Sequence, residues 1–287
     1  KGGSVKMELS KRTRNLTVKS FAIILTLMLL GIMLFPFFVM LVSMFKSPEE
    51  IYHIPPYWIP KEPTLKNFLL VWNTIPLAVY FRSSLIIAVG TVVLNTLISV
   101  PAGYAVARLH FRGKKFILYA FLVTQMFSPV VVVISLFKIV IKIHFIDTYL
   151  SVIIANAVFT TPFVIWMLNG YFSGIPKGIE DAARIDGCTR VGALWRVILP
   201  IAAPGLVTTI IYTFIYGWND FIFSLTFLQS GEKYPLTIGL YQFVGRFAVE
   251  WEQLLSAAFM AILPVLILFF MVEKQLVSGL AGGAVKE

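Results

Sequence analysis

The sequence predicts an all-α integral membrane protein with six transmembrane helices. Of its 287 residues, 58% are apolar and only 13% are charged, and the mean hydropathy is +0.85. A soluble core could not bury that proportion of apolar side chains. Six uncharged stretches are each long enough to cross a bilayer, since roughly 20 helical residues suffice. These stretches are 21–45, 83–107, 116–137, 148–176, 197–219 and 253–272.

The first stretch follows a basic segment, residues 1–20, as the apolar core of a secretory signal peptide does. However, residues 21–45 exceed the roughly 7 to 15 apolar residues of a cleavable core, and no small-residue cleavage site follows. We therefore expect the first stretch to remain as a membrane helix.

The basic residues predict the orientation, because lysine and arginine are retained on the cytoplasmic side. With the N-terminus inside, most of the 24 lysines and arginines fall on that side. This places both termini and the loop 174–200 in the cytoplasm, with the six-helix domain over 21–273 and a tail over 274–287. The net charge of +10 then reflects membrane topology rather than nucleic-acid binding, because the basic residues form no single stripe.

Proline is dense in the first outer loop and occurs once in each span. Residues 47–60 cannot form a continuous helix and predict an extended lid. Its aromatic residues suit either the lipid headgroup zone or an external partner. Prolines within spans fit helices bent around a pathway, and they equally fit ordinary kinked packing. The span prolines are Pro36, Pro101, Pro129, Pro162, Pro204 and Pro264.

Few polar side chains interrupt the spans. A buried acid in a membrane is costly and is by default a functional candidate. Asp220 fits that description, although the favoured interpretation is a solvated span end near the outer interface. The polar residues are Asn95, Gln125, Asn156, Asn219 and Asp220.

The sequence contains no pattern typical of catalysis or of metal binding. The three histidines are isolated from other metal-ligand types, and no Ser-His-Asp or H-E-x-x-H arrangement occurs. Cys188 is the only cysteine, which excludes an intrachain disulfide. The glycines of a phosphate-binding loop are also absent. We expect this chain to be non-catalytic and to bind no cofactor, so that any ATP is hydrolysed by a separate chain.

The loop between the fourth and fifth spans predicts two short helices. Residues 177–186 alternate apolar and charged side chains at near-helical spacing, and early acids complement the positive N-terminal dipole. Gly187 permits the turn that ends this helix, and Thr189 is a plausible N-cap for a second helix that runs to Pro200.

This loop resembles the EAA loop of ABC-type importer permeases, whose pattern is Glu-Ala-Ala, three residues, Gly, nine residues and Ile-x-Leu-Pro. The resemblance implies a coupling helix that docks on an ATPase, with small alanines allowing close approach and acids bonding to basic groups. A helix resting on lipid headgroups is the alternative, which the mixed charge disfavours. The matching positions are Asp181, Ala182, Ala183, Gly187, Val197, Leu199 and Pro200. The expected ATPase contacts are Glu180, Asp181, Ala182, Ala183, Asp186 and Gly187.

Other segments resemble carbohydrate-importer permeases of the maltose-transporter type, especially the smaller permease of that system. The segments are residues 47–60, 101–108, 216–220 and 279–286. In that family the C-terminal tail enters the ATPase dimer interface, and a frayed terminus would have the same composition. The corresponding tail contacts here are Gly279, Gly282, Gly283 and Lys286.

The resemblance implies one permease subunit of a heteromeric importer in a prokaryotic cytoplasmic membrane. Its expected partners are a second homologous permease, an ABC ATPase dimer that holds ATP and magnesium, and an extracytoplasmic sugar-binding protein. A di- or oligosaccharide would cross by alternating access. The candidate pathway residues are Gln125, Asn156, Asn219 and Asp220.

Three alternatives stay open at this point. An ABC permease for a polyamine, a phosphate or a peptide would share the loop motif. A self-contained secondary carrier predicts transport without an ATPase, and usually internal repeats, which are not detectable here. An intramembrane enzyme predicts a buried nucleophile with a base, which the sequence lacks.

Overall fold

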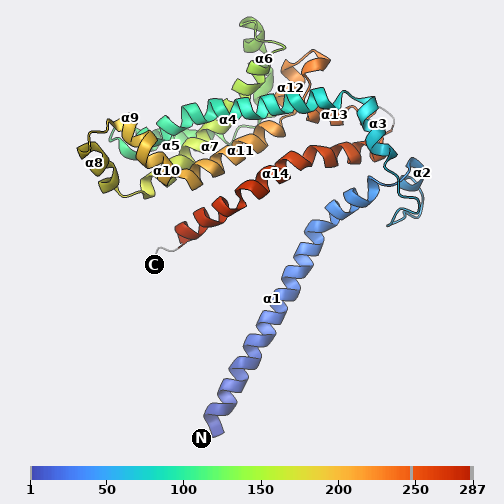
Figure 1. Ribbon diagram of the computed structural model, residues 1–287, viewed down its shortest axis with the longest axis horizontal. Coiled ribbons are helices and arrows are strands. Elements are labelled where there is room, and N and C mark those ends of the chain that lie inside the picture. The colour runs from blue at the N-terminus through green and yellow to red at the C-terminus, as the bar shows by residue number, and fades with distance from the viewer. Residues whose placement is uncertain (1, 246–247, 285–287) are drawn as a thin grey trace. The chain divides into compact units, whose positions relative to one another are not determined.

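The computed structural model describes residues 2–245 and 248–284, with side chains described for residues 19–245 and 248–273. Within these ranges every secondary-structure element is a helix, which confirms the all-α class (Figure 1). The described chain forms two compact units, Lys1–Val71 with Gly245–Phe259, and Trp72–Val244 with Met260–Glu287. The elements are α1 (Gly2–Ser43), α2 (Pro48–Ile51), α3 (Lys66–Thr74), α4 (Leu77–Arg108), α5 (Lys114–Thr124), α6 (Pro129–Lys142), α7 (Tyr149–Gly174), α8 (Lys177–Ile185), α9 (Arg190–Ala193), η1 (Leu194–Ile198), α10 (Leu199–Ile201), α11 (Ala203–Trp218), α12 (Ile222–Phe227), η2 (Gly231–Lys233), α13 (Leu236–Tyr241) and α14 (Trp251–Ala284).

The larger unit is built on three helices, α4, α7 and α11, which pack against one another. Figure 1 shows α8 and α9 at one end of these helices and α12 and α13 at the other. An apolar cluster fills each end. One cluster contains Val100, Val164, Leu168, Phe172 and Ile198, and the other contains Ile87, Val152, Phe223 and Phe227.

A buried hydrogen-bond network joins α4 to α7 between these two clusters. The Asn95 amide nitrogen donates to Thr160 Oγ1 at 2.6 Å, and the Ser99 hydroxyl donates to Asn95 Oδ1 at 2.5 Å. All three side chains are buried. Polar side chains inside a membrane domain stabilise helix pairs when they bond to each other in this way.

Four described helices are long and apolar enough to cross a membrane, and up to six crossings result if each of two bent helix pairs forms one span. The four are Lys19–Ser43, Leu77–Arg108, Tyr149–Gly174 and Trp251–Glu273. The all-α class is therefore confirmed, and four to six crossings are compatible with the expected six spans, of which the third and fifth are bent.

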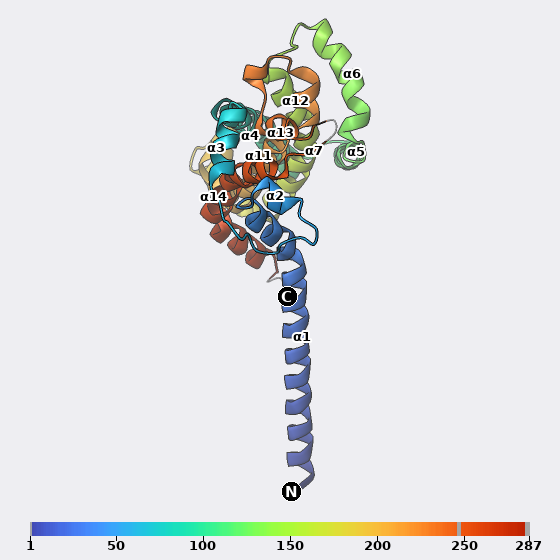
Figure 2. The same cartoon turned by 90° about the vertical axis from the view of Figure 1, so that its right-hand side faces the viewer.

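The two broken stretches each turn before a proline. α5 and α6 meet at 99°, with Ser128 extended and Pro129 in the first turn of α6 (Figure 2). The chain from α9 to α10 meets α11 at 83°, and Pro204 lies in the first turn of α11. Proline disfavours a helical residue before it, so a helix tends to restart there. The other span prolines, Pro36, Pro101, Pro162 and Pro264, lie inside continuous helices.

The smaller unit contains α1, α2 and the first outer loop. α1 is continuous from Gly2, so no break marks the expected boundary at residue 20. The expected extended lid begins with the one-turn helix α2, capped by the Ser47 hydroxyl, and continues as an irregular segment. Buried Asn67 donates to the carbonyls of Met44 and Lys46 and fixes the start of this loop. Trp58 is 62% exposed.

α14 runs without a break past residue 273, where the tail was expected to begin. Gly279, Gly282 and Gly283 belong to its helical backbone. Lys286, the fourth expected tail contact, lies outside the described residues.

Candidate functional site

The loop after α7 folds as the two short helices that the sequence predicts. α8 covers Lys177–Ile185, and the Thr189 hydroxyl accepts a hydrogen bond from the Gly192 amide at the start of α9. Gly187 has a φ of +89°, a left-handed conformation that glycine adopts without strain. The amide of Gly187 bonds to the Arg184 carbonyl and that of Cys188 to the Ala183 carbonyl. These two bonds form a Schellman cap, so the end of α8 has a fixed geometry.

Polar contacts hold the inner side of α8, and we call the groups that make them the Glu180 cluster. It consists of the side chains of Tyr104, Arg108 and Glu180 and the backbone carbonyl of Ile175. The Tyr104 hydroxyl donates to Glu180 Oε1 at 2.6 Å. Arg108 Nη2 donates to the Ile175 carbonyl at 2.9 Å. Arg108 Nε lies 3.2 Å from Glu180 Oε2, and since this contact lacks hydrogen-bond alignment it is an ion pair only.

The Glu180 cluster links the end of α4 to α8 and to the segment that follows α7. The side chains of Arg108 and Glu180 are only 5% and 12% exposed, so solvent screens their attraction weakly. Tyr104 and Arg108 are four residues apart on α4 and therefore share one helical face. That spacing was available in the sequence, but nothing in it indicated that the face meets α8.

The six residues expected to contact the ATPase divide between the two sides of α8. Asp181, Ala182, Asp186 and Gly187 are exposed, whereas Glu180 and Ala183 are buried within this chain. Glu180 is thus positioned for contacts inside the chain rather than with a partner. The sequence analysis also missed Ile185, which is 86% exposed and lies one turn after Asp181 and Ala182. The free face of α8 therefore combines small, acidic and apolar groups with the exposed guanidinium of Arg184.

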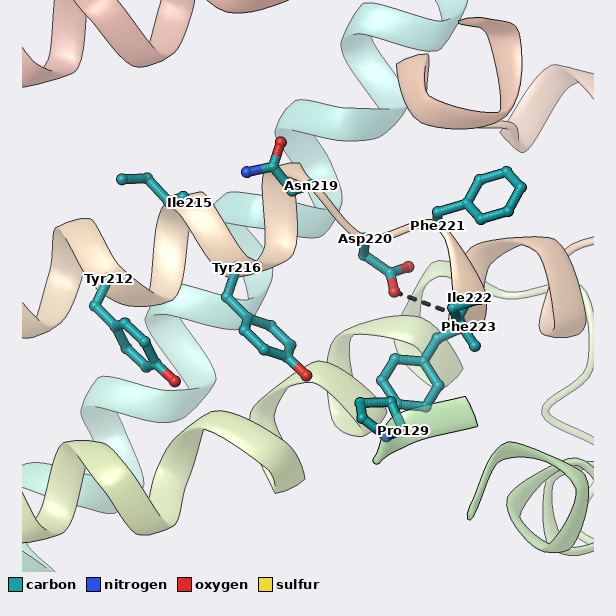
Figure 3. A pocket seen from close by; sticks show the side chains of 9 residues that line it. All are labelled: Pro129, Tyr212, Ile215, Tyr216, Asn219, Asp220, Phe221, Ile222 and Phe223. Carbon is teal, nitrogen blue, oxygen red and sulfur yellow. Dashed lines mark hydrogen bonds between the residues drawn. The ribbon is translucent and has the colours of Figure 1, made fainter. Parts of the chain in front are cut away.

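A pocket of about 420 Å³ lies at the opposite end of α11 (Figure 3). It brings Asn219 and Asp220 together with aromatic side chains, whereas the other two expected pathway residues do not line it. Gln125 is exposed and donates to the Phe159 carbonyl at 2.9 Å. The lining residues are Pro129, Tyr212, Ile215, Tyr216, Asn219, Asp220, Phe221, Ile222 and Phe223.

Asp220 is not a solvated span end, because it is buried and its carboxylate stabilises the start of α12. Its oxygens accept from the amides of Phe223 and Ser224, at 3.3 and 2.9 Å, and from the Ser224 hydroxyl at 2.6 Å. Asn156 on α7 is fully buried, and its side-chain amide lies beside the Asp220 carboxylate. The two groups are not aligned to form a hydrogen bond. In the described chain neither amide atom of Asn156 has a hydrogen-bond partner.

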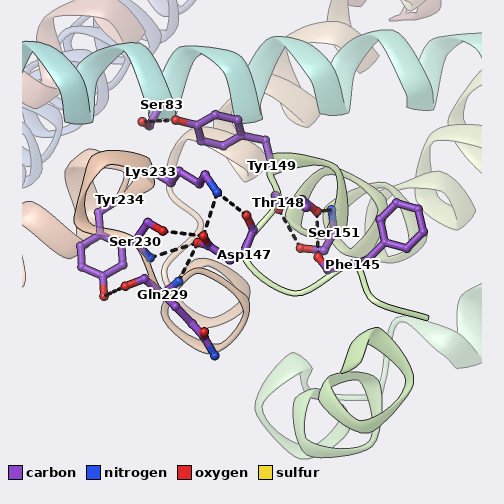
Figure 4. Close-up of polar contacts among 10 residues, drawn as sticks. All are labelled: Ser83, Phe145, Asp147, Thr148, Tyr149, Ser151, Gln229, Ser230, Lys233 and Tyr234. Carbon is purple, nitrogen blue, oxygen red and sulfur yellow. Dashed lines mark hydrogen bonds and ion pairs between the residues drawn. The ribbon is translucent and has the colours of Figure 1, made fainter. Parts of the chain in front are cut away.

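A second acid, Asp147, holds the loop before α7 against the loop after α12 (Figure 4). Its carboxylate accepts from the amides of Gln229 and Ser230, at 2.9 and 3.0 Å, and from Lys233 Nζ at 2.7 Å. Burial alone would raise the pKa of Asp147, but the bonds from Lys233, Ser230 and Gln229 outweigh it and hold the pKa well below its usual range. All the donors belong to the chain, so this contact is structural.

Comparison with known proteins identifies the family. Residues 99–276 match the family described as "Binding-protein-dependent transport system inner membrane component". The chain belongs to this family. The matched range contains the Glu180 cluster, α8 and the α11 pocket, so the permease carries both candidate sites within its family-defining region.

Two relatives show how much of the permease is shared. It is 35% identical over 257 residues to the inner membrane ABC transporter permease protein YcjP of Escherichia coli, covering 89% of this chain and 92% of the relative. It is 32% identical over 277 residues to the trehalose/maltose transport system permease protein MalG of Thermococcus litoralis, covering 95% and 99%. The permease is therefore a multi-pass membrane protein of the ABC importer type.

The fold agrees with a solved structure of a bacterial ABC transporter involved in the import of the acidic polysaccharide alginate. The TM-score is 0.77 at 22% identity, over 89% of this chain and 96% of that chain. This likeness establishes the permease fold.

Proposed function

We propose that this chain is one permease subunit of an ATP-driven importer for carbohydrates, in which α8 is the coupling helix. Its full-length similarity to a relative named for trehalose and maltose transport supports the carbohydrate class. The complex would contain a second, homologous permease, an ABC ATPase dimer that binds ATP and magnesium, and an extracytoplasmic sugar-binding protein. Both termini and α8 would lie in the cytoplasm of a prokaryotic cell, with residues 21–273 forming six spans.

The observation that carries the proposal is the two-sided structure of α8. Its outer face exposes Asp181, Ala182 and Ile185, which suit a groove with basic and apolar walls. Its inner face is fixed to α4 by the buried pair of Arg108 and Glu180. A displacement of α8 by the ATPase would therefore move α4 with it, because the buried contacts leave little freedom between the two helices.

At the other end of the same helices, a change in the position of α4 would alter the surroundings of the α11 pocket. α4 packs against α7, which carries Asn156, and against α11, which Asn219 caps. We assign Asn156, Asn219 and Asp220 to the solute pathway. Gln125 remains a candidate on a separate part of the surface.

The test compares uptake by matched variants of the reconstituted complex. Gly187→Val forces a branched side chain into a left-handed backbone, and Gly113→Val does the same at a φ of +91° in another loop. An added Cβ would meet nothing within 4 Å at either glycine, so the local strain is comparable. Asp181→Lys reverses a charge on the outer face of α8, and Glu232→Lys does so on exposed η2.

We expect Gly187→Val and Asp181→Lys to abolish ATP-driven uptake, while Gly113→Val and Glu232→Lys retain it. All four variants should accumulate in membranes. Unchanged uptake in both α8 variants would refute the assignment of α8 as the coupling helix. Uptake by the chain alone, without an ATPase, would instead favour a secondary carrier.

A further inference from the structure

We propose that this permease itself binds one end of the carbohydrate during transport, in the pocket at the end of α11. The proposal rests on the proposed function and adds a direct solute contact within this subunit. Its central residues are Tyr212, Tyr216 and Asn219, which we call the α11 stripe.

The α11 stripe is partly covered by the bundle, because Tyr212 packs against the apolar cluster of Val100 and Phe172, with its ring centroid 4.6 Å from that of Phe163 on α7. Tyr212 and Tyr216 lie four residues apart and project from α11 in the same direction, whereas the side chain of Asn219, the C-cap residue of α11, points away from them (Figure 3). The opposite side, with Ile211, Phe214 and Trp218 among others, is buried. Tyr212 and Tyr216 are half-buried and Asn219 is exposed.

The phenol hydroxyls of Tyr212 and Tyr216 and the side-chain amide of Asn219 make no hydrogen bond within the described part of the chain. Hydrocarbon cannot satisfy a phenol or an amide, and polar groups of membrane helices face protein or water-lined cavities. Since the stripe lines a pocket of about 420 Å³, its polar atoms are available to a solute that enters it. Small-molecule pockets have volumes of roughly 300 to 1,000 Å³, so this one holds a short segment rather than a long chain.

The lining chemistry favours a neutral polyhydroxylated ring. The rings of Tyr212 and Tyr216 project in the same direction from α11, with centroids 6.3 Å apart (Figure 3). Aromatic faces can cover the C–H face of a sugar ring, while the phenol hydroxyls and the Asn219 amide bond to sugar hydroxyls. This combination of aromatic walls with a few oriented polar groups is typical of ligand sites.

Charge disfavours ionic solutes in this pocket. None of the residues that line it is lysine or arginine, so a phosphate or another anion would lack a counter-charge. The one acid, Asp220, is only 8% exposed and is directed to α12, where it accepts three hydrogen bonds from Phe223 and Ser224. Asn156, buried beside Asp220 with an unpaired amide, supplies a further uncharged polar group behind this wall.

The direct test measures sugar binding to the purified complex without its external binding protein. The probes are labelled maltose, trehalose, chitobiose and arabinobiose, measured by equilibrium dialysis and by uptake into vesicles. The variants are Tyr216→Ala, Tyr216→Phe and Asn219→Ala. The control variant is Thr208→Ala. Thr208 lies on α11 outside the pocket, and the substitution removes only the hydrogen bond from its hydroxyl to the Pro204 carbonyl of the same helix.

We expect Tyr216→Ala to weaken binding roughly 5- to 30-fold, the loss of one ring contact and one hydrogen bond. Tyr216→Phe keeps the ring and Asn219→Ala removes only the amide, so each should weaken binding by less, and Thr208→Ala should match the wild type. The milder variants keep the test decisive if Tyr216→Ala fails to fold.

Four results would count against the proposal. Unchanged binding in all variants, or uptake without detectable binding to the wild-type complex, would overturn the sugar contact while leaving the carbohydrate importer intact. A reduced yield of the second permease in the stripe variants would show that the stripe is a subunit interface instead. Absence of uptake for every sugar tested would contradict the proposed carbohydrate function itself.

Discussion

Replacing Arg108 with methionine would remove the cation of the Glu180 cluster while keeping much of the side-chain volume. Glu180 would then be a buried carboxylate with Tyr104 as its remaining side-chain donor. Removing one partner of a buried ion pair typically costs about 3 to 5 kcal/mol, because the other charge stays desolvated. At about 1.4 kcal/mol per tenfold change, the equilibrium between docked and detached α8 would shift roughly 140- to 3,700-fold toward detachment.

Hydrogen exchange of the α8 amides measures this shift, since local opening exposes them to solvent. We expect exchange over residues 177–188 to accelerate by that factor in Arg108→Met. Tyr104→Phe keeps the ring packed on Phe172 but loses one bond to a charged group. This loss costs about 1.5 to 3 kcal/mol, equivalent to roughly 10- to 150-fold faster exchange.

Two further variants test the reasoning. Arg112→Met removes an exposed charge four residues after Arg108, and it should leave α8 exchange unchanged. The double variant Arg108→Met with Glu180→Leu replaces the pair by apolar groups, which is often neutral or stabilising, so exchange should return toward the wild-type rate. Wild-type exchange in Arg108→Met, with the protein folded, would refute the idea that the ion pair fixes α8.

Two other predictions concern packing and pH. An added Cβ at Gly205 would overlap the ring of Tyr171, so Gly205→Ala should destabilise the bundle by about 1 to 3 kcal/mol in thermal unfolding. Gly170 has open space around it, so Gly170→Ala should not destabilise the bundle. Equal stability of the two variants would contradict the packing of α7 on α11. The low pKa of Asp147 means that its contribution to stability is complete above the usual value of about 3.9 and is lost as pH falls through the lower folded value. Asp147→Asn should therefore accelerate exchange of the Ser230 amide at neutral pH, and the ratio to the wild type should shrink in acid; a ratio independent of pH would exclude the carboxylate as its cause.

Hydropathy and local motifs were sufficient to predict the all-α class and the two short helices of the α8 loop. Both depend on neighbouring residues: runs of uncharged residues favour membrane helices, and Gly187 and Thr189 determine where α8 ends and α9 begins. The breaks in the third and fifth stretches could not be predicted in the same way. Every span contains a proline, and whether a helix continues through it depends on which neighbours satisfy the freed carbonyl groups.

The sequence by itself determined which residues have the chemistry for coupling and for solute contact. It did not determine which way they face. Glu180 and Asp181 are adjacent acids, yet one is buried against Arg108 and the other is exposed, because successive helical residues point about 100° apart and α4 covers only one side of α8. Tertiary structure likewise decided that Asp220 bonds to α12 and that Asn219, its neighbour, lies exposed at the α11 pocket. These assignments depend on contacts between residues far apart in the chain, which local sequence patterns do not encode.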